Sequence, residues 1–331
     1  MNYQKLGKIL AKEPKYRLAQ AERAVYIDLI SDWQEASVLP LALREKLNAE
    51  CPLAIDGEIL TGNRQTEKAL VKFADGESVE AVIISHRDER NTLCVSSQIG
   101  CPIGCSFCAT GQMGFKRNLY DSEIVDQFLF FARHLKKTNQ KITNVVFMGM
   151  GEPFLNYDHV ISAIRMLNDP AKFNFGARRI SISTCGLVPG IDKLASEDLQ
   201  VNLAISLHSA DDDLRSRLVP MNNEYNLTKL FKAVDRYIEK TSRRVMFEYL
   251  LIDGINDSPA QARELAKKMK KLYLVNLITY NHTGGEFKPS SPEARRLFKQ
   301  ILEQERVAVT ERISFGDDID AACGQLATKR K

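Results

Sequence analysis

The sequence predicts an α/β protein: a partial (β/α)6 barrel of the TIM type, with a small N-terminal accessory domain that combines helices and a β-hairpin. From about residue 92, apolar and β-branched runs alternate with amphipathic helical segments, which is the pattern of a parallel sheet covered by helices. The runs are almost continuously apolar, as strands buried on both faces are. About six such units can be counted, fewer than the eight of a closed barrel.

The accessory domain precedes the barrel. Residues 1–50 form the predicted helical region, because apolar side chains recur at helical spacing from Leu18 to Ile30 and again in LPLALREKL (39–47). Residues 51–91 form the predicted β-hairpin region. There KALVKF (68–73) and SVEAVII (78–84) flank a turn signal at Asp75-Gly76, as the strands of a hairpin do.

The main domain covers residues 92–331 and contains the predicted barrel. Its predicted strands are 92–97, 144–150, 179–184, 201–207, 244–252 and 275–280, with a further strand-like run at 307–314. The predicted helices are 121–137, 157–168, 226–240, 258–272 and 291–305. Ser258, Pro259 and Gln261 supply an N-cap, a first-turn proline and a capping-box partner for one of them. In such barrels, chemistry occurs at the C-terminal ends of the strands.

Composition narrows the class of protein. Hydrophobic residues make up 44% and charged residues 27% of the 331 residues, as in ordinary globular proteins. The N-terminus lacks the apolar core of a signal peptide, and seven clustered cysteines do not resemble a secreted disulfide framework. We therefore expect a cytoplasmic protein without membrane spans. A net charge of +4 permits a nucleic-acid partner without requiring one.

Three cysteines follow the first barrel strand in the pattern Cys101-x₃-Cys105-x₂-Cys108. A closed structural zinc site needs four protein ligands, and a four-iron cluster is normally held by four thiolates. Three thiolates on such a cluster leave one iron free to bind a small molecule. The spacing therefore favours a reactive 4Fe-4S cluster. The alternative is a zinc knuckle completed by a distant His or Cys.

Polar residues and glycines follow several other predicted strands. The second strand ends in MGMGEP (148–153), and the third and fourth end near Ser183 and Ser206-Leu207-His208. Hydroxyl and imidazole groups at strand ends suit a nucleoside ligand, and Asn281 after the sixth strand could hydrogen-bond an adenine edge. Neighbouring Thr184 and Ser209 are as easily explained as caps of the next helix.

The cysteine motif after the first strand of a partial barrel resembles the radical S-adenosylmethionine (SAM) superfamily. The resemblance implies one 4Fe-4S cluster held by Cys101, Cys105 and Cys108, with SAM on the open iron. It also implies that Gly151 and Glu152 contact the amino group of SAM. Ser183, Ser206, Leu207, His208 and Asn281 are the other predicted SAM-binding residues.

Two further segments narrow the resemblance. GDDIDAACGQL (316–326) and CVSSQIGC (94–101), together with MGMGEP, LAISLH and NLI-x-x-N, resemble the RlmN/Cfr group of radical SAM RNA methyltransferases. That group methylates carbon 2 or carbon 8 of adenosine. The similarity covers nearly the whole chain.

The resemblance also implies roles for residues outside the cysteine triplet. Cys323 as thiolate takes a methyl group from one SAM and becomes S-methylcysteine. Hydrogen abstraction from that methyl group allows its carbon to add to adenine, which links the protein to RNA. Cys94 then attacks the sulfur of Cys323, releasing methylated RNA and leaving a transient disulfide. Glu80 is the implied proton acceptor, while Cys51 and Cys185 match no family role and are taken as structural.

The implied substrate is an adenosine in the peptidyl-transferase region of 23S ribosomal RNA, with carbon 2 favoured. Members that methylate carbon 2 can also act on adenosine 37 of certain transfer RNAs. An electron donor such as flavodoxin or ferredoxin is implied, and we expect a monomer. Three alternatives stay open: methylation of carbon 8, a radical SAM enzyme acting on a substrate other than RNA, and a non-catalytic RNA-binding iron–sulfur protein.

Overall fold

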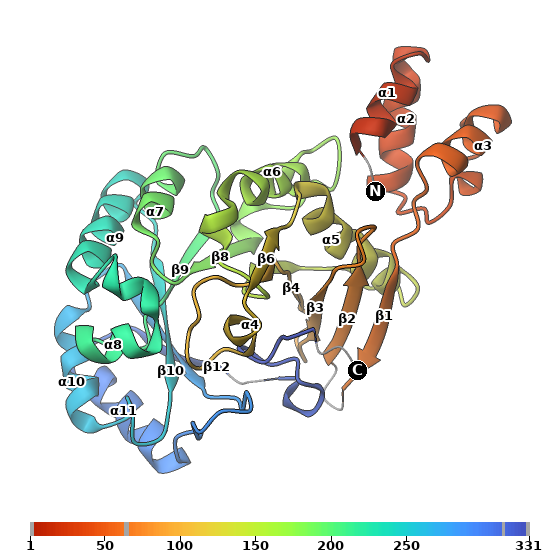
Figure 1. The fold of residues 1–331 in the computed structure, drawn as a ribbon. Helices are drawn as coiled ribbons and strands as arrows, with labels where there is room; N and C mark the ends of the chain where they lie inside the picture. The colour runs from red at the N-terminus through yellow and green to blue at the C-terminus, as the bar shows by residue number, and fades with distance from the viewer. Residues whose placement is uncertain (1–2, 63–65, 313–314, 329–331) are drawn as a thin grey trace.

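The computed structural model describes residues 3–62, 66–312 and 315–328. Ten strands of these residues form one curved sheet in the order β1-β2-β3-β4-β7-β8-β9-β10-β11-β12, and helices cover its outer face (Figure 1). The predicted α/β partial barrel is confirmed. Within the described ranges, no helix is both long and apolar enough to cross a membrane.

The accessory hairpin is part of the barrel sheet. Strands β1 (Gly57–Thr61), β2 (Thr66–Lys72) and β3 (Ser78–Ser85) are antiparallel, with Leu70 opposite Glu80. β3 also pairs antiparallel with β4 (Asn91–Cys94), the first barrel strand. The hairpin therefore extends the sheet of the barrel and holds Glu80 beside the start of the main domain.

All later strands of the large sheet run parallel to β4. They are β7 (Asn144–Phe147), β8 (Ile180–Thr184), β9 (Asn202–Ser206), β10 (Val245–Leu251), β11 (Tyr273–Thr279) and β12 (Val309–Arg312). Each coincides with a predicted strand, although the last two residues of the predicted 307–314 strand lie outside the described residues. A separate two-stranded sheet, β5 (Gln98–Gly100) with β6 (Phe115–Asn118), frames the cysteine loop.

The long barrel helices match their predicted ranges. They are α5 (Asp121–Lys136), α6 (Tyr157–Asn168), α9 (Leu227–Thr241), α10 (Pro259–Lys268) and α11 (Pro292–Gln304). The predicted capping box at the start of α10 is present, with Ser258 accepting from the Gln261 amide. Three short helices were not predicted: α4 (Ala109–Gln112), α7 (Val188–Leu194) and α8 (Asp212–Leu218). Two turns or fewer are too short to display a helical period.

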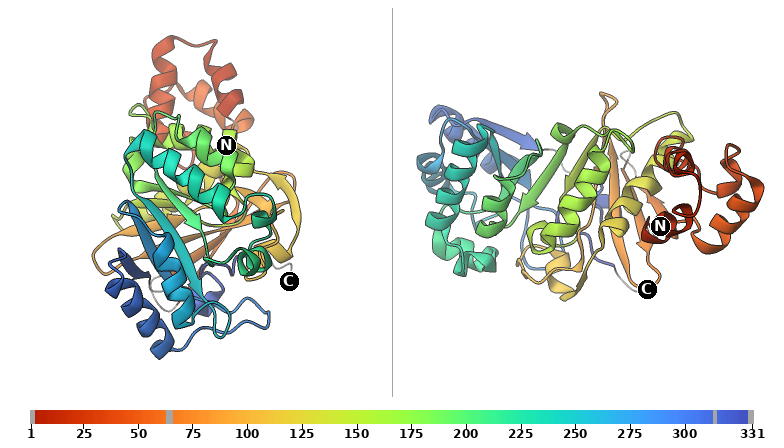
Figure 2. Two further views of the ribbon diagram at one scale, coloured as in Figure 1. Left: turned by 90° about the vertical axis from the view of Figure 1, so that its left-hand side faces the viewer. Right: turned by 90° about the horizontal axis from the view of Figure 1, so that it is seen from above.

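Helices α1 (Tyr3–Leu10), α2 (Lys15–Tyr26) and α3 (Leu41–Glu50) lie at the end of the molecule next to β1 (Figures 1 and 2). Trp33 anchors this part of the chain. It is fully buried, and its indole N–H donates to the carbonyl of Cys51 at 2.8 Å. Short 3-10 helices complete the fold at Trp33–Glu35, Pro153–Asn156, Ala177–Arg179, Pro220–Asn223 and Asp317–Ile319.

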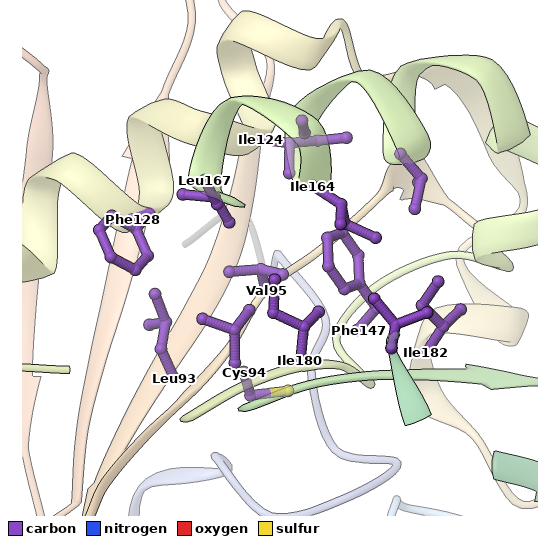
Figure 3. Close-up of a cluster of buried hydrophobic side chains, with 14 of the residues drawn as sticks. Leu93, Cys94, Val95, Ile124, Phe128, Phe147, Ile164, Leu167, Ile180 and Ile182 are labelled. Atoms are coloured by element: carbon purple, nitrogen blue, oxygen red, sulfur yellow. The ribbon is translucent and has the colours of Figure 1, made fainter. Parts of the chain in front are cut away.

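The core between helices and sheet fixes which side chains enter the barrel. Strand residues such as Leu93 and Ile180 pack against Phe128 of α5 and Leu167 of α6 (Figure 3). Successive side chains of a strand point to opposite faces. Cys94 accordingly directs its sulfur away from these helices, toward the interior of the barrel (Figure 3).

Candidate active site

The three clustered cysteines line one cavity at the C-terminal end of the barrel, which we call the cysteine cavity. Its volume is about 160 Å³. Nine predicted site residues line it: Cys101, Cys105, Cys108, Gly151, Glu152, Ser183, Ser206, His208 and Cys323. Leu207, Asn281, Cys94 and Glu80 are not among its lining residues. Most of the predicted site residues therefore lie together, as expected for residues at the C-terminal ends of the barrel strands.

Two glycines allow the loops around this cavity to approach closely. Gly100 adopts φ +72°, and a Cβ there would lie 1.9 Å from the carbonyl oxygen of Gly114. Gly151 adopts φ +100°, and a Cβ there would lie 2.5 Å from the Cβ of Gln98. Any side chain at either position would displace backbone or a neighbouring side chain. The GMGEP segment is thus held directly against the loop that precedes the cysteines.

Glu152 is buried at the base of the cysteine cavity. Its carboxylate accepts hydrogen bonds from the backbone amides of Phe154 at 3.0 Å and Cys185 at 2.8 Å. Burial raises the pKa of this carboxyl group, and the two amide bonds oppose that shift. A buried carboxylate with fixed orientation is suited to receive a cationic ammonium group.

His208 is a neutral imidazole. Burial lowers the pKa of His208 to about 3, and its Nδ1 accepts from the backbone amide of Leu250 at 3.0 Å. Because Nδ1 is an acceptor, the ring proton is assigned to Nε2. The ring meets Phe107 edge-on, with 4.6 Å between ring centroids. His208 can therefore donate one hydrogen bond inside the cavity without carrying charge.

The C-terminal segment 321–327 is tied to three parts of the fold. The amide of Ala109 donates to the Gly324 carbonyl at 2.8 Å, which fixes the segment to the cysteine loop. The Asn281 amide donates to the Cys323 carbonyl at 3.2 Å, which fixes it to the end of β11. The Ala327 amide donates to a Glu80 carboxylate oxygen at 2.9 Å, which fixes it to the hairpin. These contacts hold Cys323 in one place although no regular helix or strand carries it.

A second cavity, which we call the barrel cavity, lies inside the barrel and has a volume of about 600 Å³. Cys94 lines it, together with the strand residues Thr92, Asn144, Ser181 and Asn276. Five residues line both cavities and form their shared wall: Met148, Glu248, Ile278, Arg312 and Cys323. Cys323 thus has the cysteine triplet on one side and Cys94 on the other.

Arg312 is the cationic residue of the shared wall that contains Cys323. It donates to the Met148 sulfur at 3.3 Å. The neighbouring Cys323, with Glu248 and Cys94, raises the pKa of this guanidinium, and burial opposes that shift. Burial and the nearby Cys323 raise the pKa of the Cys94 thiol to about 12, and Arg312 opposes the shift. Both cysteines are free thiols in this structure, so no Cys94–Cys323 disulfide is present.

Glu80 is buried, and both oxygens of its carboxylate have partners. One carboxylate oxygen forms an ion pair with Lys68 at 3.1 Å, and the other accepts from Ala327. Burial raises the pKa of Glu80, although Lys68 opposes that effect. Glu80 lines neither cavity. It reaches the site through the C-terminal segment that carries Cys323.

The sequence reasoning missed three charged residues around the cavities: Arg215, Glu248 and Arg312. Glu248 on β10 accepts from Asn276 at 3.0 Å, while its second carboxylate oxygen is buried and makes no hydrogen bond with the described residues. The signal available in the sequence was a charge inside an apolar strand, as in RVMFEYLLI. Arg215 had no such signal, because it lies in a short polar helix.

Three thiols on one loop are a donor set of the kind that holds an iron–sulfur cluster. Within the described residues, no three His, Cys, Asp or Glu side chains are placed to hold one metal ion together. A cubane does not require that arrangement, because each thiolate binds a different iron. Burial raises the pKa of the Cys101 thiol to about 12, and metal binding is what deprotonates such thiols.

The chain is similar to known proteins along almost its whole length. The family model of the radical SAM superfamily matches residues 95–266. The chain is 44% identical over 318 residues to a Dictyoglomus turgidum protein named probable dual-specificity RNA methyltransferase RlmN, covering 95% of this chain and 91% of that protein. It is 42% identical over 326 residues to ribosomal RNA large subunit methyltransferase N of Nitrosopumilus maritimus, covering 95% and 93%. A crystal structure of a radical SAM methyltransferase from Sphaerobacter thermophilus matches with a TM-score of 0.95 and 45% identity, covering 99% and 98%.

Proposed function

Because the chain belongs to the RlmN family of radical SAM methyltransferases, we propose that it methylates carbon 2 of an adenosine in 23S ribosomal RNA. Adenosine 37 of transfer RNA is the proposed second target, in line with the dual specificity in the relatives' names. The target base must leave its stack to reach a cavity at the barrel end. The observation that best supports this proposal is the position of Cys323 in the wall between the two cavities.

We propose that Cys101, Cys105 and Cys108 hold a 4Fe-4S cluster and that the cysteine cavity holds SAM beside it. When bound and reduced by a donor such as flavodoxin or ferredoxin, the cluster supplies the electron that cleaves SAM. Glu152 would receive the ammonium group of SAM, because its carboxylate is buried and already oriented by two amides. Ser183 and Ser206, whose hydroxyl oxygens are 3.4 Å apart, and His208 would donate to the polar groups of SAM. Leu207 and Asn281 would contribute to SAM binding indirectly, Leu207 as a buried residue after β9 and Asn281 through its hydrogen bond to the Cys323 carbonyl.

Cys323 is the proposed methyl carrier. Its thiolate would displace S-adenosylhomocysteine from SAM, so that a sulfur–carbon bond forms at Cys323 as the sulfonium–methyl bond breaks. Arg312 supplies a positive charge in the same wall as Cys323, and a nearby cation stabilises a thiolate nucleophile. Cys94 would later attack the sulfur of Cys323 from the barrel cavity, giving the transient disulfide and freeing the RNA.

Glu80 is the proposed proton acceptor. Its raised pKa makes this carboxylate a stronger base than an ordinary glutamate. In the structure the carboxylate is bound by Lys68 and the Ala327 amide, so its action requires a shift of the C-terminal segment. Glu80→Gln keeps the size of the side chain and should stop product formation after methylation of Cys323.

Nucleoside mass spectrometry tests the proposal directly. RNA from a strain that lacks the gene should have lost 2-methyladenosine from 23S ribosomal RNA, and from transfer RNA if both are targets. The wild-type gene should restore it, and a Cys323→Ala gene should not. Cys51→Ala is the matched control, because Cys51 is buried in the accessory domain away from both cavities. Restoration of 8-methyladenosine instead would overturn the assignment to carbon 2.

A further inference from the structure

Arg215 is a fully buried cation whose hydrogen-bond acceptors are all neutral. Its guanidinium donates to the carbonyls of Leu207 at 3.0 Å, Cys185 at 2.7 Å and Ser206 at 3.1 Å. The fourth acceptor is the amide oxygen of Asn222 at 2.8 Å. Within the described residues, no carboxylate forms an ion pair with it.

A buried charge without a charged partner is strongly destabilising. Burial lowers the pKa of Arg215 to about 10, so the group stays protonated at neutral pH. The carbonyl dipoles offset part of the cost of burial. The Asp212 carboxylate belongs to this network only indirectly, through the Asn222 amide that donates to it at 3.0 Å. The guanidinium itself can still stabilise a further negative charge when the site is filled.

The cysteine loop is where that charge would be. Helix α8, which carries Arg215, ends at Leu218, and the Leu218 carbonyl accepts from the Ser106 amide at 3.1 Å. Leu218 and Ile103 belong to one apolar cluster against which Cys105 packs. Cys185, whose carbonyl accepts from Arg215 at 2.7 Å, lines the same cavity as Cys101 and Cys105.

We propose that Arg215 is a positioning residue for the cluster: its buried positive charge stabilises the reduced, more negative state and keeps the reduction potential within reach of the electron donor. This inference rests on the proposed ligand set of Cys101, Cys105 and Cys108. Each thiolate adds negative charge to the cluster, and reduction adds more. Nearby charge is one of the factors that set the potential of an iron–sulfur cluster.

The test is a potentiometric titration of the anaerobically reconstituted protein, followed by electron paramagnetic resonance of the reduced cluster. In Arg215→Gln, the ratio of reduced to oxidised cluster at a fixed solution potential should fall about tenfold, which is 59 mV for a one-electron couple. Arg215→Lys keeps the charge and should stay close to wild type. Arg217→Gln is the matched control, because Arg217 is exposed on the same short helix. An unchanged ratio in Arg215→Gln, or an equal fall in Arg215→Lys, would overturn the inference.

Asn222→Asp provides a second route if Arg215→Gln does not fold. It gives the guanidinium a carboxylate partner at the position of the present 2.8 Å contact while Arg215 remains. The ratio should again fall, and a rise or no change would contradict the inference. Iron content separates this inference from the proposed function. If the wild-type protein takes up no cluster, the proposed ligand set is contradicted. If the cluster forms normally but its reduction potential is the same in these variants as in the wild type, only the role of Arg215 is contradicted.

Discussion

The two cavities that meet at Cys323 differ in size and in the parts of the chain that line them. The cysteine cavity, about 160 Å³, is lined mainly by loop residues that follow strand ends. The barrel cavity, about 600 Å³, is lined largely by side chains within the strands, including Thr92, Asn144 and Ser181. Sequence motifs concentrate at the first cavity and are sparse at the second. The difference teaches that Cys323 can be reached from two sides: from a small cavity bounded by the sequence motifs, and from a larger cavity with a greater share of polar lining.

Removal of the shared thiol should have the largest effect. Cys323→Ala should abolish RNA methylation, since the proposed methyl carrier is gone, while cluster content and SAM binding stay near wild type. Nucleoside mass spectrometry, iron analysis and calorimetry with SAM measure the three quantities. Methylation of RNA above about a tenth of the wild-type rate would show that Cys323 is not the methyl carrier.

Removal of the thiol on the barrel side should stop the reaction later. Cys94→Ala keeps the cysteine cavity intact, so Cys323 should still be methylated and linked to RNA, but release should fail. A denaturing gel should then show a protein–RNA adduct. Recovery of free RNA and free protein after turnover would contradict the role of Cys94 in releasing the RNA from Cys323.

Displacement of the loop that carries Gly151 and Glu152 should weaken SAM binding without removing any reactive group. A Cβ in Gly151→Ala would lie 2.5 Å from Gln98 in a backbone with φ +100°. We expect a loss of about 1–3 kcal/mol in unfolding free energy and about tenfold weaker SAM binding. Gly76→Ala is the control, because Gly76 has φ +82° with no atom within 4 Å of the added Cβ. It should show the backbone strain alone, with SAM affinity unchanged.

The smallest expected effect concerns His208 and pH. Burial lowers its pKa to about 3 from the ordinary 6.5. Between those values the unfolded chain binds a proton that the folded chain does not, so stability falls as the pH drops below about 6.5. In His208→Gln that decline should be shallower by up to about 1.4 kcal/mol per pH unit. Urea unfolding between about pH 6 and 5 measures it, with His159→Gln as comparison, and equal slopes in all three proteins would refute the neutral assignment.

Strand and helix positions could be predicted because periodicity and caps are local. The strand at 180–184 and the helix starting after Ser258 followed from neighbouring residues alone. Helix α8 could not be predicted in this way, because its seven residues span too little of a helical period. The same short helix carries Arg215, which is why the buried cation beside the cysteine loop gave no signal in the sequence.

The sequence by itself determined which residues the proposed chemistry uses. The spacing of three cysteines, the Gly-Glu turn and the AACGQL segment are short-range patterns whose meaning does not depend on distant contacts. Only the tertiary structure decided how those parts meet. Cys94 and Cys323 are far apart along the chain, and β4 and the C-terminal segment bring them to the lining of one cavity. Likewise, Glu80, Glu248 and Arg215 are buried by packing between elements distant in sequence. Burial decides whether such a charge is only solvated or acts on its neighbours.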